Sequence, residues 1–450
     1  MKFIFSLIVF CLTFSSFGND QKSRFQKLEL FNKVLYLIES QYYRPVDTEK
    51  LIQGALKGMM NTLDPHSTFL DQKVYSKMQE DTRGEFGGLG IEVTQKDGVI
   101  IVITPIDDTP AFKAGIKPGD KIVEISHEST LGVTLEEAVD KMRGKPGSKI
   151  TIGIVREGVE GIKRFTLKRK SIKVSAVKSK VLKDNYVYVR LTQFQKNAGK
   201  SISKTLKSMK KKLNGNLNGI VLDLRSNPGG LLDEAVNVSS LFLDDGIVVS
   251  TEGRDPKQKE IRYVKKTGYK DLKTPIAVLI NGASASASEI VAGALQDHKR
   301  AIILGTQSFG KGSVQSIAKI DDMKGVKLTI AQYMTPNDRK IQAVGIKPDI
   351  IISQYEGAWV AEHESGSEYI RERDLKNHLT ATIETKEEKS RREKREKEER
   401  VKRVQAIKNK KKKTNLSDKK LPSGPEQDYQ VNQAIKHLKT YQFVKKIIKS

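Results

Sequence analysis

The sequence predicts an α/β protein, and three observations along its 450 residues support this class. Between residues 171 and 352, apolar strand-like runs alternate with helical stretches, which is typical of an α/β core. Between 84 and 170, short strand signals are separated by glycine turns, which indicates a β-rich domain. Between 25 and 80, apolar residues recur at helical spacing. A chain of this length is expected to hold two or three domains.

The first 18 residues have the pattern of a secretory signal peptide. A positive start at Lys2 precedes an apolar run at 3–14, and small residues offer a cleavage point after Gly18. The run is too short for a comfortable membrane span. Its Cys11 is the only cysteine in the chain, so the mature protein would hold no disulfide. We therefore expect an exported protein, located in the periplasm.

The helical segment at 25–80 shows two apolar faces and no catalytic pattern. Their members are Phe31, Val34, Leu35 and Ile38 on the first face, and Leu51, Ile52, Ala55, Leu56 and Met59 on the second. His66 follows in an Asp-Pro-His-Ser sequence, which is more typical of a helix-ending turn than of a functional histidine. We expect this segment to be a packing element.

The β-rich domain at 84–170 is predicted from four strand runs and one short helix. The runs are Gly90–Val93, Val99–Ile103, Lys121–Ile125 and Ile150–Val155. The helix is expected at Thr134–Met142, because Thr134 can cap its first turn and Glu136 and Glu137 favour its N-terminus.

The α/β core at 171–352 carries three apolar strand runs and three helical stretches. The strands are expected at Val187–Leu191, Ile220–Leu224 and Ile276–Ile280, and the helices at 198–213, 231–243 and 289–297. Open α/β sheets place their chemistry at strand ends. Two glycine- and serine-rich turns of this region are therefore candidate sites.

The first candidate turn is a Ser/Ala alternation that follows Asn281-Gly282, and the second is Gly310-Lys311-Gly312. A serine hydroxyl needs a base within hydrogen-bond reach. A lysine can be that base if burial removes its proton, and flanking glycines allow a close, deep approach of the backbone. N–H groups at a helix start can stabilise an oxyanion. Taken alone, a strand-to-helix turn of small residues more often serves only packing and capping. A glycine-flanked lysine taken alone is more often a solvated loop residue.

The residues themselves leave the nucleophile undecided between Ser284, Ser286 and Ser288. Histidine offers little as a base, because none of the six histidines lies in a turn beside the serines. His298 falls at the end of the third helical stretch. A Ser-His-Asp arrangement therefore has no local support.

The chain resembles the bacterial C-terminal processing peptidases, also called tail-specific proteases, over roughly residues 30–352. The motifs that carry the resemblance occur in order: LDPHSTFLD, RGEFGGLGIEV, TPAFKAGIKPGDKIVEI, LDLRSNPGGLLDEAV, GASASASEI, SFGKGSVQ and VGIKPDI. The resemblance implies a serine-type endopeptidase with a crotonase-like spiral α/β core, a PDZ domain at 84–170 and flanking helices.

The resemblance also implies the roles of particular residues. Ser286 would be the nucleophile, Lys311 its general base, and Gln315 the residue that holds the lysine amine. The oxyanion donors would be the N–H of Ala287 and that of a glycine in the Asn-Pro-Gly-Gly turn. Gly229 and Gly230 both remain open for that second donor.

A PDZ domain binds an extended peptide as an added strand and holds its terminal carboxylate with loop N–H groups. The loop that matches this task contains Gly88, Leu89, Gly90 and Ile91, because glycines let N–H groups converge on one anion. Leu89 and Ile91 are expected to line the pocket for the last side chain. The implied substrates are unfolded or tagged proteins with free C-termini, and an adaptor or activator protein and a homo-oligomer are further expected partners.

The formal charge of +26 is unevenly spread, and the C-terminal extension at 353–450 contains a strongly basic run. Residues 386–413 hold 15 Lys/Arg and 6 Glu, a net of +9, which is typical of an exposed, solvated segment. Such a run is also attracted to an anionic membrane surface. It contains no base-stacking aromatic residue, so nucleic acid is not an expected partner. No cofactor is expected, and no cluster has metal-site spacing.

Two other functions are considered. A catalytically silent PDZ adaptor or chaperone would not need Ser286, Lys311 and Gln315 together. A crotonase-like enzyme acting on a thioester would need a phosphate cradle, and none is present in the sequence.

Overall fold

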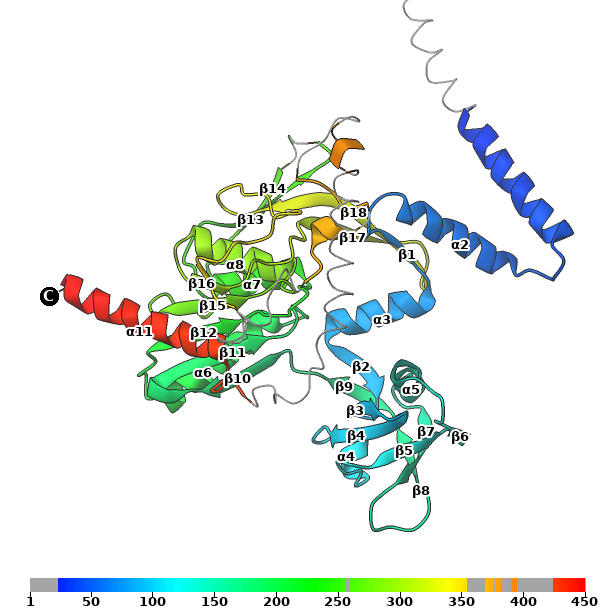
Figure 1. Cartoon of the computed structure of the whole chain (residues 1–450), viewed down its shortest axis with the longest axis horizontal. Helices are drawn as coiled ribbons and strands as arrows, with labels where there is room; N and C mark the ends of the chain where they lie inside the picture. Colours follow the sequence, from blue (N-terminus) through cyan, green and yellow to red (C-terminus); the bar gives the residue numbers. More distant parts are fainter. Residues whose placement is uncertain are drawn as a thin grey trace, which may run out of the picture.

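The computed structural model describes residues 23–255, 257, 259–353, 369–375, 377–381, 388, 390–392, 394 and 424–449 (Figure 1). The predicted signal peptide at 1–18, with Cys11, lies outside the described residues. So does most of the basic segment at 386–413.

The centre of the molecule is a six-stranded sheet with the order β10-β11-β12-β15-β16-β19. All neighbours are parallel except β10 and β11, which pair antiparallel. The three predicted core strands are confirmed within one residue at each end. The strands are β10 (Val177–Val181), β11 (Tyr186–Leu191), β12 (Gly219–Asp223), β15 (Ile276–Ile280), β16 (Ile302–Gly305) and β19 (Ile350–Ile351), with a 3-10 turn, η1 (Lys183–Asn185), before β11.

Both faces of this sheet are buried. Alternate residues of β12 point to opposite sides and belong to two different cores. Ile220 and Leu222 belong to the large core under helices α6 (Ala198–Lys212), α7 (Leu232–Ser240) and α8 (Ala287–Asp297). Val221 belongs to a smaller core under α11 (Tyr429–Lys449), which crosses the other face (Figure 1). The result is a helix–sheet–helix arrangement, as expected for a parallel sheet.

The predicted boundaries of the core helices differ from the observed ones by more than one residue at two places. Helix α7 ends at Ser240, three residues before the predicted end, because the N–H groups of Phe242 and Leu243 turn back to Ser239 O. The residues after Ser240 continue the apolar pattern of the helix because they are buried, although they are no longer helical. Helix α8 begins at Ala287, two residues before the predicted start.

A second sheet packs beside the helices and has the order β1-β18-β13-β14, with β17 on β18. Its first strand comes from the N-terminal segment, so the beginning of the chain is tied to the core. The strands are β1 (Thr68–Leu70), β13 (Ile247–Gly253), β14 (Lys259–Tyr263), β17 (Ser313–Lys319) and β18 (Gly325–Met334).

The region predicted as a PDZ domain forms its own sheet around its own core. The sheet has the order β3-β4-β5-β7-β8, with β6 on β5, and β2 pairs with β9 beside it. Thr134 caps α5 and forms a capping box with Glu137, which confirms the predicted helix. The elements are β2 (Glu85–Gly88), β3 (Ile91–Lys96), β4 (Val99–Pro105), α4 (Pro110–Lys113), β5 (Lys121–Ile125), β6 (Glu128–Ser129), α5 (Leu135–Met142), β7 (Lys149–Val155), β8 (Lys163–Lys168) and β9 (Lys170–Lys173).

The N-terminal segment is helical, as predicted, with helices at 23–41, α2 (Thr48–Asn61) and α3 (Gln72–Arg83). Helix α3 contacts α5 through exposed ion pairs, including Lys73–Asp140 at 2.6 Å. None of the helices in the described part of the chain is long and apolar enough to span a bilayer.

Candidate active site

The three serines of the Ser/Ala run have different environments. Ser284 is fully buried, and its Oγ donates to Leu224 O at 2.9 Å. Ser288 is also fully buried, and its Oγ donates to Asn227 O at 2.9 Å. Ser286 between them is only partly buried. Two of the three hydroxyls therefore serve packing, and Ser286 is the one that a substrate can approach.

The backbone at Ser286 is strained. The residue caps α8 with φ +56° and ψ −115°, a left-handed conformation that is costly for a residue with a Cβ. A sharp strand-to-helix turn of this kind lifts the side chain away from the sheet, like the nucleophile turn of the α/β-hydrolases. The strain has to be offset by the surrounding contacts.

The buried carboxylate of Glu289 supplies those contacts. Its Oε2 accepts the N–H of Ser286 at 2.8 Å and the N–H of Lys311 at 2.9 Å. Its Oε1 accepts Ser308 Oγ at 2.5 Å and the N–H of Gly310 at 2.7 Å. One oxygen therefore binds the backbone of both predicted catalytic residues, and their two nitrogens can be no farther apart than the sum of those two distances.

Burial raises the pKa of Glu289 to about 7, although its four hydrogen bonds favour the charged form. The carboxylate is the form with room for four donors, since a protonated oxygen would need an acceptor of its own. The site is therefore assembled best when Glu289 is ionised. The sequence reasoning missed Glu289, although a glutamate three residues after a helix-capping serine is a capping-box signal.

Lys311 lies half-buried in the loop between β16 and β17. Within the described residues, its Nζ forms neither a hydrogen bond nor an ion pair. Burial lowers the pKa of the Lys311 ammonium, and the charge of Lys327 lowers it further, whereas Glu372, Glu289 and Asp64 oppose the change. Desolvation without a salt-bridge partner favours the neutral amine, which is the form that can act as a base.

Glycines allow the lysine loop to approach its neighbours closely. A Cβ at Gly312 would lie 2.3 Å from the backbone nitrogen of Gln342, and Gly310 has φ +98°. Neither position tolerates a side chain without a shift of the backbone.

Gln315 is the third residue of β17, and its Nε2 donates to Ser313 Oγ at 2.9 Å. The same amide lies 3.4 Å from Thr329 Oγ1. Among the described residues, no donor to the Gln315 Oε1 atom is recorded, so that oxygen is available to an amine. Its role in holding the lysine amine stays a prediction.

Of the two candidate glycines, Gly229 lies directly beside Ser286 and Ala287. Asn227 O accepts the N–H of Ala285 at 3.0 Å, which joins the Asn-Pro-Gly-Gly turn to the nucleophile turn. A Cβ at Gly229 would come within 2.8 Å of Ser286 Cβ. The Gly229 N–H donates to Asn227 Oδ1 at 2.9 Å, whereas the structure records no acceptor in the described residues for the N–H of Gly230 or of Ala287. This difference favours Gly230 over Gly229 as the second donor.

The predicted carboxylate loop connects β2 to β3, with Gly88 ending one strand and Ile91 beginning the next. The carbonyls of Leu89 and Gly90 accept the N–H groups of Ala111 and Ile106, at 3.0 and 2.8 Å. No acceptor for the loop N–H groups of Leu89 and Gly90 is recorded among the described residues. The Leu89 side chain lies in the domain core.

Neither His298, which follows α8, nor His66, which follows α2, has a recorded contact with Ser286. His298 caps the far end of α8 and bonds Ile247 O at 2.7 Å. His66 follows α2 in a turn, as predicted, but its Nε2 also bonds the buried carboxylate of Glu372. Sequence reasoning had no signal for that contact.

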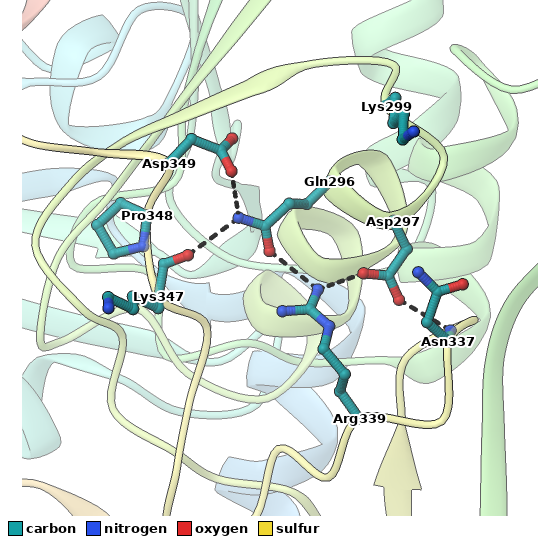
Figure 2. Close-up of a pocket in the computed structure, with 8 residues that line it drawn as sticks. All are labelled: Gln296, Asp297, Lys299, Asn337, Arg339, Lys347, Pro348 and Asp349. Atoms are coloured by element: carbon teal, nitrogen blue, oxygen red, sulfur yellow. Dashed lines mark hydrogen bonds and ion pairs between the residues drawn. The ribbon is translucent and has the colours of Figure 1, made fainter.

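A polar cavity of about 380 Å³ lies at the C-terminal end of α8 (Figure 2). Helix α8 is about 16 Å long at 1.5 Å per residue, so this cavity is far from Ser286. Its groups are bonded to one another: Gln296 donates to Asp349 at 2.7 Å, and Arg339 pairs with Asp297. It is therefore not part of the candidate active site. In the described part of the chain, no group of three or more His, Cys, Asp or Glu is placed to bind a metal.

Comparison with known proteins identifies the family. The model of peptidase family S41 matches residues 185–352, that of the PDZ domain residues 87–163, and that of the activating protease CtpB N-terminal domain residues 12–74. A carboxy-terminal-processing protease of Bartonella bacilliformis is 47% identical over 351 residues, which covers 78% of this chain and 80% of that protein. This chain belongs to the carboxy-terminal-processing protease family. It is accordingly a serine-type endopeptidase, and the silent-adaptor and thioester alternatives are not favoured.

Other members of the carboxy-terminal-processing protease family align over a similar span. The carboxy-terminal processing protease CtpA of Bacillus subtilis is 38% identical over 329 residues, which covers 73% of this chain and 69% of that protein. A solved structure of the photosystem II D1 C-terminal processing protease is 30% identical and covers 69% of this chain and 84% of that chain, with a TM-score of 0.43.

Replacing Glu289 by Gln should lower both stability and activity. The amide keeps the size of the side chain but turns two acceptor sites into a donor group that faces other donors. Leaving buried N–H groups unpaired costs about 1–3 kcal/mol in unfolding free energy. Chemical denaturation and peptidase assays of the folded variant would measure the two effects.

Glu234→Gln is the matched control for that variant. Glu234 is also buried and accepts the N–H groups of Asn197 and Gly199 at 3.0 and 2.9 Å, but it bonds neither catalytic turn. It should lose stability while the folded fraction keeps its activity. Equal activity in wild type and Glu289→Gln would contradict the organising role of Glu289.

Proposed function

We propose that this protease cleaves peptide bonds with a dyad of Ser286 and Lys311 after capturing C-terminal tails through its PDZ domain. The observation that carries the proposal is the shared Glu289 oxygen, which fixes the backbone of Ser286 beside that of Lys311, a half-buried lysine whose Nζ has no recorded partner among the described residues. The resemblance of the motifs around both residues supports the same assignment.

In the first step, Ser286 Oγ attacks the scissile carbonyl carbon while Lys311 Nζ accepts the hydroxyl proton. The carbonyl oxygen becomes an oxyanion, and the N–H groups of Ala287 and Gly230 stabilise its charge. As the intermediate collapses, the C–N bond breaks and the ammonium of Lys311 gives its proton to the leaving amine. The product is an acyl-serine ester.

In the second step, a water molecule attacks the ester while Lys311 again accepts a proton. The second tetrahedral intermediate uses the same two N–H donors, and its collapse restores the hydroxyl of Ser286. Gln315 orients the lysine amine through its free Oε1 atom during both steps. No metal or cofactor takes part in this scheme.

The PDZ domain would select substrates by their C-terminus. The N–H groups of the Gly88–Ile91 loop are suited to a terminal carboxylate because they converge where no side chain intervenes. The bound tail would extend the sheet along β3, as an added strand does in other PDZ domains. Unfolded or tagged proteins with free C-termini are the proposed substrates, and an adaptor or activator protein and self-association are compatible with this scheme.

Ser286→Ala and Lys311→Ala should each abolish cleavage of an unfolded protein that ends in apolar residues. Ser286→Ala should still bind a peptide with a free terminal carboxylate, and bind its C-terminal amide more weakly. Exposed residues of β17 provide matched controls, Ser316→Ala and Lys319→Ala, which should cleave like the wild type. Cleavage by Ser286→Ala would contradict the assignment of Ser286 as the nucleophile.

Peptidase activity should rise with pH. Lys311 becomes a base as its ammonium loses a proton, and burial places the pKa of that ammonium below its usual range. Glu289 acts in the same direction, since it is mostly ionised only above a pKa of about 7. A profile of kcat/KM from mildly acidic to mildly alkaline pH measures this, and a flat profile would argue against Lys311 as the base.

We also propose that the protein is exported to the periplasm. The pattern at residues 1–18 supports this, and the basic segment at 386–413 suits peripheral attachment to an anionic membrane surface. Protein recovered from a periplasmic fraction is expected to begin at Asn19. Intact Met1 on protein confined to the cytoplasm would contradict export.

A further inference from the structure

The two candidate catalytic turns are contacted by a short stretch from the C-terminal part of the chain, residues 369–375, which we call the C-terminal clasp. It includes the 3-10 turn η2 (Glu372–Asp374). The chain reaches it after the last strand of the core sheet. No step of the proposed mechanism uses any of its residues.

The clasp touches both catalytic turns. Tyr369 Oη accepts from Asn281 Nδ2 at 3.3 Å, in the turn before Ser286, and its ring lies against Gly282. Arg371 donates to Gln307 Oε1 at 2.7 Å, and the N–H of Glu372 donates to Phe309 O at 3.2 Å, both in the lysine loop.

Glu372 is the centre of the clasp. Its side chain is fully buried, and its two carboxylate oxygens lie 2.9 and 2.8 Å from Nε2 of His66. Its Oε1 also accepts Gln342 Nε2 at 3.0 Å. A buried carboxylate is costly unless it is paired and hydrogen-bonded, and these partners meet both conditions.

From Glu372 the contacts lead to both sides of Lys311. On one side, the Glu372 backbone holds Phe309. On the other side, Gln342 accepts the N–H of Gly312 through Oε1 at 2.9 Å, while its Nε2 binds Glu372. The loop segment that carries Lys311 is therefore fixed at two points by one residue, through the backbone N–H of Glu372 at Phe309 and through its carboxylate at Gln342.

The ionisable groups around Lys311 come from several elements. Glu289 lies at the start of α8, Asp64 and His66 in the turn after α2, Glu372 in η2, and Lys327 in β18. Asp64 is itself held by Ser67 and Thr329, at 2.7 and 3.1 Å between oxygens. Burial lowers the pKa of Lys311 most, Lys327 adds to this, and Glu372 is the first of the acids that oppose it.

We propose that Glu372, held by His66, is a positioning residue of the peptidase, which fixes the lysine loop for proton transfer through Phe309 and through Gln342. The inference rests on the proposed Ser286–Lys311 chemistry and extends it. The N-terminal segment, the core and the C-terminal clasp thus all contribute to the placement of one lysine.

The test uses the full chain with an unfolded protein substrate and follows kcat/KM against pH. Glu372→Gln keeps the size of the side chain and removes its charge. Its activity should fall at least tenfold, because Lys311 is less well placed. The rising limb of its pH profile should also move to lower pH, because a negative charge that raises the pKa of Lys311 is gone.

Asp374→Asn is the matched control, since it removes one negative charge from the same turn while its amide oxygen can still accept the Arg371 N–H. Asp374→Asn should keep the wild-type kcat/KM, and the rising limb of its pH profile should stay at the wild-type pH. If Glu372 had a purely structural role, Glu372→Gln would have a smaller folded, active fraction, and the rising limb of its pH profile would stay at the wild-type pH. That result would overturn the proposal. So would a wild-type profile for Glu372→Gln.

His66 provides an independent arm if Glu372→Gln does not fold. The amide of His66→Gln can still donate to Glu372 near the position of Nε2, whereas His66→Ala cannot. We expect His66→Gln to retain several times more activity than His66→Ala. Equal activity of the two variants would overturn the proposal.

The Ser286→Ala variant separates the two levels of inference. If it cleaves, the proposed chemistry fails, and the role of Glu372 fails with it. If it is inactive while Glu372→Gln behaves like the wild type, only the positioning role is lost.

Discussion

The proposed catalytic arrangement depends on one buried carboxylate, that of Glu289. Two turns at the ends of separate strands, β15 and β16, must meet for a serine to face a lysine. Both turns expose backbone N–H groups that no regular ladder can satisfy, and Glu289 accepts three of them together with the hydroxyl of Ser308. Because unpaired buried donors are costly, the carboxylate holds the two turns in a single geometry and offsets the strained backbone of Ser286.

The rest of the fold provides the rigid frame for that meeting. The parallel sheet is buried on both faces, between the α6–α8 layer and α11. Close to the site, Arg225 at the start of the Asn-Pro-Gly-Gly turn bonds Asp223, Asp428 and Gln430. Removing one partner of such a buried network is costly, so Asp428 and Gln430, at the start of the C-terminal helix, stabilise the Asn-Pro-Gly-Gly turn.

Sequence patterns predicted those features that depend on neighbouring residues. The core strands, the capped helix after Thr134 and the two candidate turns all follow from local spacing and turn chemistry. They could not decide between Ser284, Ser286 and Ser288, because that choice depends on which hydroxyls find acceptors in a distant turn. The end of α7 was misplaced because burial prolonged an apolar pattern beyond the helix. The contact of His66 with Glu372 joins residues 306 positions apart, and no local pattern encodes it.

The contact between His66 and Glu372 also sets an order of assembly during biosynthesis. The chain emerges from its N-terminus, so the serine turn and the lysine loop are made before residue 372 exists. Until the clasp is present, the lysine loop lacks Glu372, whose backbone N–H binds Phe309 and whose carboxylate binds Gln342. A nascent or truncated chain would therefore carry an incomplete protease, which limits damage to its own unfolded tail and to neighbouring chains that have not yet folded.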